Sequence, residues 1–317
     1  MVNLVIGAAA SGKSEYAENI VMSLPGEKIY IATMEPFGAE AKERIARHRA
    51  LRAGKGFSTI ERPRDLIGLT PEPDWNVLIE DLPNLAANEF FSPGGGGAAA
   101  VFSGLDRICK TASGVTIVTG DIFSDGGTYD AGTREYMDML ADLHMRIADK
   151  ADNVVEVICG IPCAVKGELP MNTVRYETAE LEALNCAEVN VKEVVDQNRK
   201  HVYVTGPMAS GKREYVLDTL GIPASEAAFE VQELLRERPD LDMAALAGKL
   251  SGFHAITQTE VGAGVIPLSA SDREWREKAG RLACLLAARA DIVVRMVCGV
   301  PITVKDFEAA GPAVILK

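Results

Sequence analysis

A glycine-rich segment near the start of the sequence has the residue types and the spacing of a phosphate-binding loop. It consists of Gly7, Ala8, Ala9, Ala10, Ser11, Gly12, Lys13 and Ser14. In such a loop, successive backbone N–H groups bind phosphate oxygens, Lys13 reaches the β- and γ-phosphates, and the Ser14 hydroxyl ligates Mg²⁺. We therefore predict a nucleoside triphosphate site here, with Mg²⁺ as its metal ion.

Two neighbouring acids follow the hydrophobic run 77–79. Enzymes with a phosphate-binding loop place a metal-facing carboxylate at the end of a neighbouring strand, and Glu80 and Asp81 have this position. The pattern is weak by itself, because any buried strand can end in an acid. We expect Glu80 to lie at the nucleotide and Asp81 or Glu80 to face the metal ion.

A basic stripe surrounds a histidine further along the first half of the chain. Arg44, His48 and Arg52 are spaced four residues apart, so in a helix they share one face. Such a face would suit a polyphosphate, and a histidine within it could attack phosphorus as a nucleophile. The alternative is a solvated basic helix with a surface histidine, and spacing alone favours that alternative.

Strands alternate with helices around these residues, which predicts a mostly parallel sheet covered on both faces. Short apolar runs predict strands at 2–6, 28–33, 76–82, 115–119, 154–159 and 163–166. Apolar residues at helical spacing predict helices at 15–24, 40–53 and 131–150. The glycines at 94–97 and the alanines at 98–100 are expected to form a mobile loop, because consecutive glycines bury little surface.

Two parts of the sequence recur later in the chain. Residues 7–16 read GAAASGKSEY and residues 206–215 read GPMASGKREY. Residues 151–166 have a similar counterpart at 290–305. The interval between these two landmarks is much shorter in the second copy, so one copy is full length and the other is cut down.

The fold class predicted from this repeat is an α/β fold of the P-loop NTPase type, present as two tandem copies. The full-length domain is expected at 1–167, a connector at 168–199 and the degenerate second copy at 200–317. In the second loop Arg213 stands where Ser14 stands in the first, and an arginine cannot coordinate Mg²⁺. We therefore expect no turnover of a magnesium nucleotide at the second loop.

The composition is that of an ordinary globular protein of 317 residues, with 47% hydrophobic and 25% charged residues. A formal net charge of -12 argues against a non-specific nucleic-acid or anionic-membrane binder. The six cysteines lack CxxC spacing, which indicates reduced thiols. No apolar run reaches the ~18 residues of a membrane helix. We expect neither a signal peptide nor an anchor, and a cytoplasmic location.

Taken in order, these motifs resemble the bifunctional adenosylcobinamide kinase / adenosylcobinamide-phosphate guanylyltransferase family of cobalamin biosynthesis. The resemblance rests on residues 7–14, Tyr30 to Thr33, Arg44, His48, Arg52, Glu61, Glu80 and Asn88. It covers about residues 1–167, and residues 200–307 match the two ends of the same family without its middle.

The resemblance implies a transferase with two consecutive reactions on a corrinoid. Adenosylcobinamide is phosphorylated from ATP or GTP, and GMP is then transferred from GTP through a guanylylated histidine, which maps onto His48. Lys13 is the catalytic residue implied for the kinase step. The implied nucleotide-binding residues are Gly7 to Ser14, Thr33, Arg44, Arg52, Glu61 and Glu80, and Mg²⁺ is assigned to Ser14 and Asp81. The family also implies assembly as a homo-oligomer.

One segment departs from the family pattern. Where the family has Thr-Asn-Glu-Val-Gly, the first copy reads TGDIF at 119–123, whereas the second copy keeps TEVG at 259–262. One hypothesis is that the copies complement each other, with residues 260–267 completing the first copy's site. The main alternative is a nucleotide-binding regulatory or assembly protein, derived from this family, that has lost one or both activities.

Overall fold

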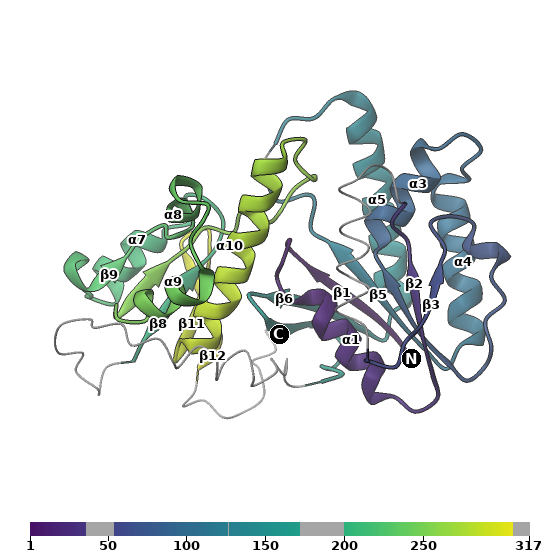
Figure 1. The fold of residues 1–317 in the computed structure, drawn as a ribbon, viewed down its shortest axis with the longest axis horizontal. Coiled ribbons are helices and arrows are strands. Elements are labelled where there is room, and N and C mark those ends of the chain that lie inside the picture. The colour runs from purple at the N-terminus through teal and green to yellow at the C-terminus, as the bar shows by residue number, and fades with distance from the viewer. Residues whose placement is uncertain (36–53, 126, 172–199, 307–317) are drawn as a thin grey trace. The chain divides into compact units, whose positions relative to one another are not determined.

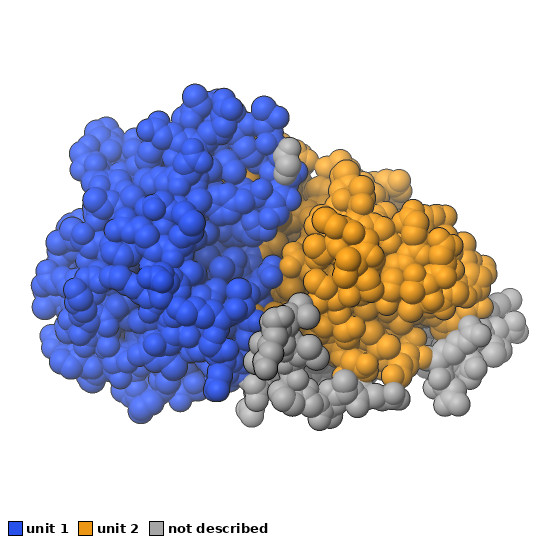
Figure 2. All heavy atoms as spheres, turned by 180° about the vertical axis from the view of Figure 1, so that it is seen from behind, with its two compact units in different colours: residues 1–7, 13–156, 164–172 blue, residues 8–12, 157–163, 173–317 orange. Residues whose placement is uncertain are grey.

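The structure is a computed structural model that describes residues 1–35, 54–125, 127–171 and 200–306. It contains one sheet of seven strands and one of five (Figure 1). The chain divides into two compact units (Figure 2). Unit 1 comprises residues 1–7, 13–156 and 164–172, and unit 2 comprises residues 8–12, 157–163 and 173–317. The tip of the glycine-rich loop, residues 8–12, thus belongs to unit 2.

The seven-stranded sheet has the strand order β3-β2-β4-β5-β1-β6-β7. Its strands are β1 (Val2–Gly7), β2 (Glu27–Ala32), β3 (Ser58–Glu61), β4 (Trp75–Glu80), β5 (Gly114–Gly120), β6 (Asn153–Ile158) and β7 (Ile161–Lys166). The strands from β3 to β6 pair in parallel. The interior strands β4 and β5 are almost wholly buried, as expected for a parallel sheet covered on both faces.

The helices of unit 1 are α1 (Lys13–Ser23), α3 (Leu82–Phe91), α4 (Gly97–Thr111) and α5 (Ala131–Lys150), with a 3-10 turn at Leu66–Gly68. Helices α3, α4 and α5 contact one another, whereas α1 contacts β1, β4 and β5. The connection from β1 to β2 runs toward the β3 edge of the sheet, whereas those from β4 to β5 and from β5 to β6 run toward the β7 edge. Because such crossovers are right-handed, α1 lies on one face of the sheet and α3, α4 and α5 lie on the other.

The ends of the parallel strands bring Gly7 and Glu80, two of the predicted site residues, to one edge of the sheet. β1 ends at Gly7, β4 at Glu80 and β5 at Gly120. Because parallel strands share a direction, these carboxyl ends meet at the same edge, where α/β proteins bind ligands.

The five-stranded sheet of the second copy has the order β12-β11-β8-β10-β9. Its strands are β8 (Val202–Thr205), β9 (Ala227–Ala228), β10 (Ala255–Thr257), β11 (Ile292–Val297) and β12 (Val300–Asp306). All pairs are parallel except β11 with β12. The helices are α7 (Lys212–Glu214), α8 (Gln232–Glu237), α9 (Met243–Leu250) and α10 (Ala270–Arg289), with a π-helical turn at Tyr215–Thr219 and a 3-10 turn at Ala224–Glu226.

The predicted α/β fold in two copies is confirmed, because the backbone repeats in detail. Ala10 and Ala209 have φ angles of 53° and 55°, and the loop glycines that follow have φ angles of 88° and 87°. The N–H of Gly160 donates to the carbonyl of Ser11 at 2.8 Å, and the same bond joins Gly299 and Ser210 at 3.1 Å. Residues 172–199, most of the predicted connector, lie outside the described residues.

The six predicted strands and two of the three predicted helices are present, within a few residues of the expected ends. The third helix, at 40–53, lies outside the described residues. The prediction of a mobile loop up to residue 100 was wrong, because α4 begins at Gly97. The Glu89 carboxylate accepts from the N–H of Gly96, and the alanines that follow are strong helix formers.

Over the described residues, none of the helices combines the length and the apolarity that crossing a membrane requires.

Candidate functional site

The glycine-rich loop joins β1 to α1, as its sequence context predicts. β1 ends at Gly7 and α1 begins at Lys13. The positive φ of Gly12, 88°, turns the chain into the helix at a conformation that favours glycine. The N-terminal N–H groups of α1 lack partners within the helix and carry partial positive charge, which favours a bound phosphate.

Ser14 and Glu80 are in direct contact within unit 1. The Ser14 hydroxyl donates to Glu80 Oε1 at 2.6 Å. The second carboxylate oxygen, Oε2, is buried and has no hydrogen-bond partner among the described residues. A buried carboxylate oxygen without a partner is unfavourable, so this atom is available to a ligand that binds beside Ser14.

The pKa of Glu80 is raised to about 7. Burial is the largest cause, and the nearby Asp81 carboxylate raises the pKa further. The hydrogen bond from Ser14 and the charge of Lys13 oppose this rise. The pKa of Glu80 is therefore close to neutral pH, and a cation bound nearby would lower it and favour the ionised carboxylate.

Asp81 has a different set of contacts. Its Oδ1 accepts from the backbone N–H and the side-chain amide of Asn84, at 2.8 and 2.7 Å, and so caps α3. Its backbone N–H donates to Thr33 Oγ1 at 2.7 Å, and the Thr33 hydroxyl donates to the Asp81 carbonyl at 2.8 Å. Of the two acids, Glu80 is thus the one in contact with Ser14.

Thr33 and Glu61 extend the same edge of the sheet. Thr33 is buried directly after β2, and its carbonyl accepts from the Asn88 side chain at 2.8 Å. Glu61 is exposed at the end of β3, where its register partner is Ala32. The other predicted site residues, Arg44, His48 and Arg52, lie outside the described residues.

His144, a histidine of α5 that the sequence analysis did not select, contacts Thr119 of β5. His144 Nε2 is 2.6 Å from Thr119 Oγ1, and burial lowers the pKa of His144 to about 4. The N–H of Asp121 donates to the Gly7 carbonyl at 3.2 Å. The imidazole is therefore neutral near pH 7, as a partner of Thr119.

Within unit 2, residues 8–12 contact two glycines of the TEVG-containing copy. The N–H of Ala9 donates to the Gly262 carbonyl at 2.9 Å. A Cβ on Gly262 would lie 2.9 Å from Ala9 N, and one on Gly280 would lie 2.5 Å from the Ala9 carbonyl oxygen. Only glycine permits this close approach of backbone at either position. The Glu260 carboxylate accepts instead from Arg295 at 2.8 Å.

The donor set at Ser14 suits Mg²⁺. This ion binds proteins through one or two oxygen ligands and takes the remainder from water and substrate phosphates. The Ser14 hydroxyl and the unpartnered Glu80 Oε2 are such ligands. No group of three or more His, Cys, Asp or Glu side chains that could hold a metal occurs among the described residues.

Comparison with known proteins identifies the family of this chain. The sequence pattern of the CobU family, described as cobinamide kinase / cobinamide phosphate guanyltransferase, matches residues 3–165 and 211–304. The bifunctional adenosylcobalamin biosynthesis protein CobP of Pseudomonas aeruginosa is 30% identical over 177 residues, which are 53% of this chain and 99% of that protein. The corresponding CobU of Salmonella typhimurium is 28% identical over 183 residues, or 52% of this chain and 100% of that protein.

The two matched segments correspond to the two copies, each with its own sheet. The order of motifs, the fold and the match over most of the sequence lead to one conclusion. The chain belongs to the cobinamide kinase / cobinamide phosphate guanyltransferase family.

Proposed function

We propose that this protein phosphorylates adenosylcobinamide and then transfers GMP from GTP to the adenosylcobinamide phosphate. The observation that carries the proposal is the contact of Ser14 with Glu80 at the start of α1, where one carboxylate oxygen is buried without a partner. Family membership supports the choice of reactions and of a corrinoid substrate.

In the kinase step, the loop holds the triphosphate of ATP or GTP. The backbone N–H groups of residues 8–14 and the Lys13 ammonium bind its phosphate oxygens. Ser14 and Glu80, with Asp81 as the alternative acid, would hold Mg²⁺, which neutralises phosphate charge when bound. The corrinoid hydroxyl oxygen forms a bond to the γ-phosphorus as the bond to the β,γ-bridging oxygen breaks. The nucleoside diphosphate leaves.

In the guanylyltransferase step, His48 is the proposed nucleophile. An imidazole nitrogen bonds to the α-phosphorus of GTP, and pyrophosphate leaves. The phosphate of the corrinoid then displaces the histidine and forms a diphosphate bond. Arg44 and Arg52 would balance the charge on the phosphorus oxygens. Thr33 and Glu61 are proposed as further nucleotide-binding residues.

The covalent intermediate tests the proposal. Purified protein is incubated with α-labelled GTP, and the adduct is examined for the acid lability and base stability of a phosphoramidate. We expect a labelled protein whose label is lost in His48→Ala and kept in His254→Gln, a control histidine in the second copy. A protein that never becomes labelled, or a label that persists in His48→Ala, contradicts the guanylyltransferase step. Transfer of the γ-phosphate to cobinamide then tests the kinase step separately.

A further inference from the structure

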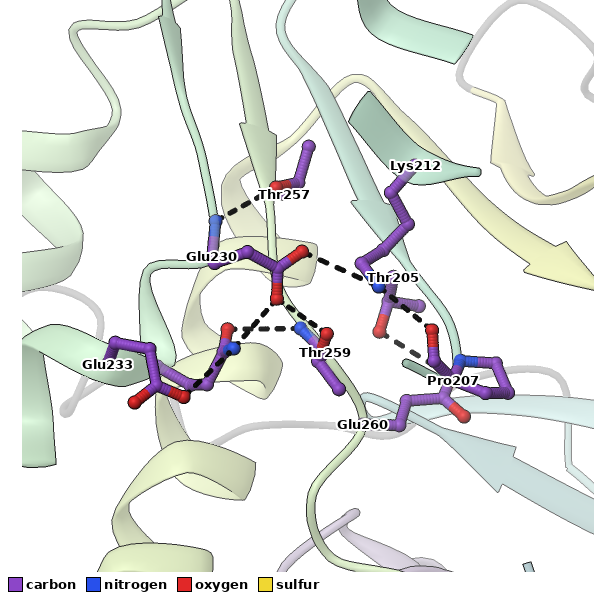
Figure 3. A network of polar contacts seen from close by, with 9 residues as sticks. Thr205, Pro207, Lys212, Glu230, Glu233, Thr257, Thr259 and Glu260 are labelled. Atoms are coloured by element: carbon purple, nitrogen blue, oxygen red, sulfur yellow. Dashed lines mark hydrogen bonds and ion pairs between the residues drawn. The ribbon is translucent and has the colours of Figure 1, made fainter. Parts of the chain in front are cut away.

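The lysine of the second glycine-rich loop is already bound by the protein itself. Lys212 is only 4% exposed. Its ammonium donates to the Pro207 carbonyl at 2.9 Å and lies 3.5 Å from Glu230 Oε1 (Figure 3). A phosphate-binding loop needs this ammonium for the β- and γ-phosphates. In the second loop, the Lys212 ammonium instead binds the Pro207 carbonyl and the Glu230 carboxylate.

The sheet register identifies the residues that correspond between the copies. In unit 1, Leu4 of β1 and Ile79 of β4 pair with the same residue of β5. In unit 2, Tyr203 of β8 and Ala228 of β9 pair with the same residue of β10. Leu4 and Tyr203 both lie three residues before the first loop glycine. Ile79 and Ala228 therefore occupy equivalent positions.

The next two residues of each copy show what has replaced the magnesium ligands. Phe229 stands at the position of Glu80. The guanidinium of Arg213, which replaces Ser14, lies 4.3 Å from the centre of the Phe229 ring. A cation–π contact thus occupies the place of the hydroxyl–carboxylate contact, and neither partner offers an oxygen to a metal ion.

Glu230 stands at the position of Asp81, and its carboxylate is fixed in place. Glu230 Oε2 accepts from the Thr259 hydroxyl at 2.5 Å (Figure 3). The same oxygen accepts from the Gln232 amide at 2.8 Å. Its backbone N–H donates to Thr257 Oγ1 at 3.0 Å. These contacts hold a negative group beside Lys212, where a phosphate would otherwise bind.

The helix that follows the second loop differs from α1. α7 spans Lys212–Glu214 and continues as a π-helical turn over Tyr215–Thr219. In the first copy, α1 runs for 11 residues from Lys13. The two copies therefore differ in this helix as well as in the side chains at the loop.

We infer that the second loop carries the chain's own Glu230 carboxylate in place of a phosphate, so that Lys212 is a structural ion-pair partner and each chain binds one nucleoside triphosphate. The stoichiometry rests on the proposed function of the first loop. The ion pair of Lys212 with Glu230 does not depend on the proposed function, because both residues belong to unit 2. In this account, Lys212 is retained because its ion pair with Glu230 stabilises the second copy.

The number of nucleotide sites per chain tests the inference that each chain binds one nucleoside triphosphate. A non-hydrolysable GTP analogue is titrated with Mg²⁺ into the full chain, into Lys13→Ala and into Lys212→Met, and the sites per chain are counted calorimetrically. We expect one site in the wild type, one in Lys212→Met and none in Lys13→Ala. Two sites in the wild type, or a site in Lys13→Ala that the double variant loses, would overturn the inference. Absence of binding in the wild type would instead contradict the proposed function.

Thermal unfolding, measured without any nucleotide, tests the inference that Lys212 and Glu230 form a structural ion pair. Glu230→Gln and Lys212→Met should each lower Tm, because each leaves the other charged group without its partner. The double variant should lose less than the sum of the two. Glu237→Gln, on the exposed side of α8, is the matched control and should leave Tm unchanged. Additive losses of Tm, or single variants as stable as the control, would show that the ion pair of Glu230 with Lys212 does not stabilise the protein.

Discussion

Glu80 combines a buried position with a contact to the loop serine, and these two properties have opposite electrostatic effects. Burial raises its pKa to about 7, while the Ser14 hydroxyl favours the ionised form. A carboxyl group with this pKa changes charge near neutral pH. Its ionisation should therefore couple the stability of unit 1 to pH and to the binding of a cation.

The pH dependence of stability follows from the sign of this shift. At a pH between 4.5, the ordinary pKa of a glutamate, and about 7, the raised pKa of Glu80, folded Glu80 keeps a proton that the unfolded chain has released. Folded stability should therefore fall as pH rises through this interval, and Glu80→Gln should remove that part of the fall. Urea unfolding without metal between about pH 5 and about pH 8 measures it. Equal pH dependence in both proteins would count against the raised pKa.

The loop lysine should matter for rate and very little for folding. Lys13→Ala removes the cation proposed to bind the transferring phosphate, so kcat/KM for the kinase step should fall about 10²–10³-fold. Lys28→Ala is the matched control, because the hydrogen bond of the Lys28 ammonium within the described residues goes to the exposed Gly26 carbonyl. Unchanged kinetics in Lys13→Ala would exclude this loop as the donor site.

At the scale of elements, the start of α3 decides which acid faces the loop. Asp81 caps this helix through Asn84, and Thr33 binds the Asp81 backbone. An Asp-to-Ala change at a helix cap costs about 1 kcal/mol, whereas asparagine retains the cap. Asp81→Ala should lose about this much stability in urea unfolding, and Asp81→Asn should lose little.

The same pair of variants separates capping from metal binding. If the carboxylate charge is needed for Mg²⁺, Asp81→Asn should raise the Mg²⁺ concentration that half-saturates the kinase step. If Glu80 is the ligand, that concentration should rise in Glu80→Gln and stay constant in Asp81→Asn. The contact of Ser14 with Glu80 leads us to expect the second result.

The strands that the sequence predicted contain short apolar runs, and β4 and β5 among them are almost wholly buried. The edge strand β3 was missed because its four residues are mostly exposed and carry no apolar pattern. The approach of Glu80 to Ser14 was expected from motif context. The orientation of Asp81 was not, because it depends on Asn84, whose role is visible only once α3 is placed.

At the scale of the whole molecule, the two copies share a backbone and differ in the side chains that meet at the loop. The repeat was visible in the sequence, because glycine and lysine positions are identical in both loops. The exchange of a hydroxyl–carboxylate contact for an arginine–phenylalanine contact was not visible, because Phe229 is distant from Arg213 in sequence and only the sheet register relates it to Glu80.

The glycines of unit 2 that touch residues 8–12 should tolerate no side chain. Gly262→Ala and Gly280→Ala each force backbone apart at Ala9, which should cost about 1–3 kcal/mol and weaken nucleotide binding. Gly248→Ala is the control, since a Cβ there meets nothing within 4 Å. Calorimetric titration of the GTP analogue measures the effect. Wild-type affinity in Gly262→Ala would show that the Ala9 contact does not shape the loop.

The complete conversion of adenosylcobinamide by the purified chain tests the account most directly. The chain is supplied with Mg²⁺, ATP and GTP, and the corrinoid products are identified by mass spectrometry. We expect the phosphate and then its GMP adduct, with both products formed far more slowly in Lys13→Ala and only the phosphate in His48→Ala. A corrinoid that stays unmodified in the wild type, or products formed at the wild-type rate in Lys13→Ala, would contradict it.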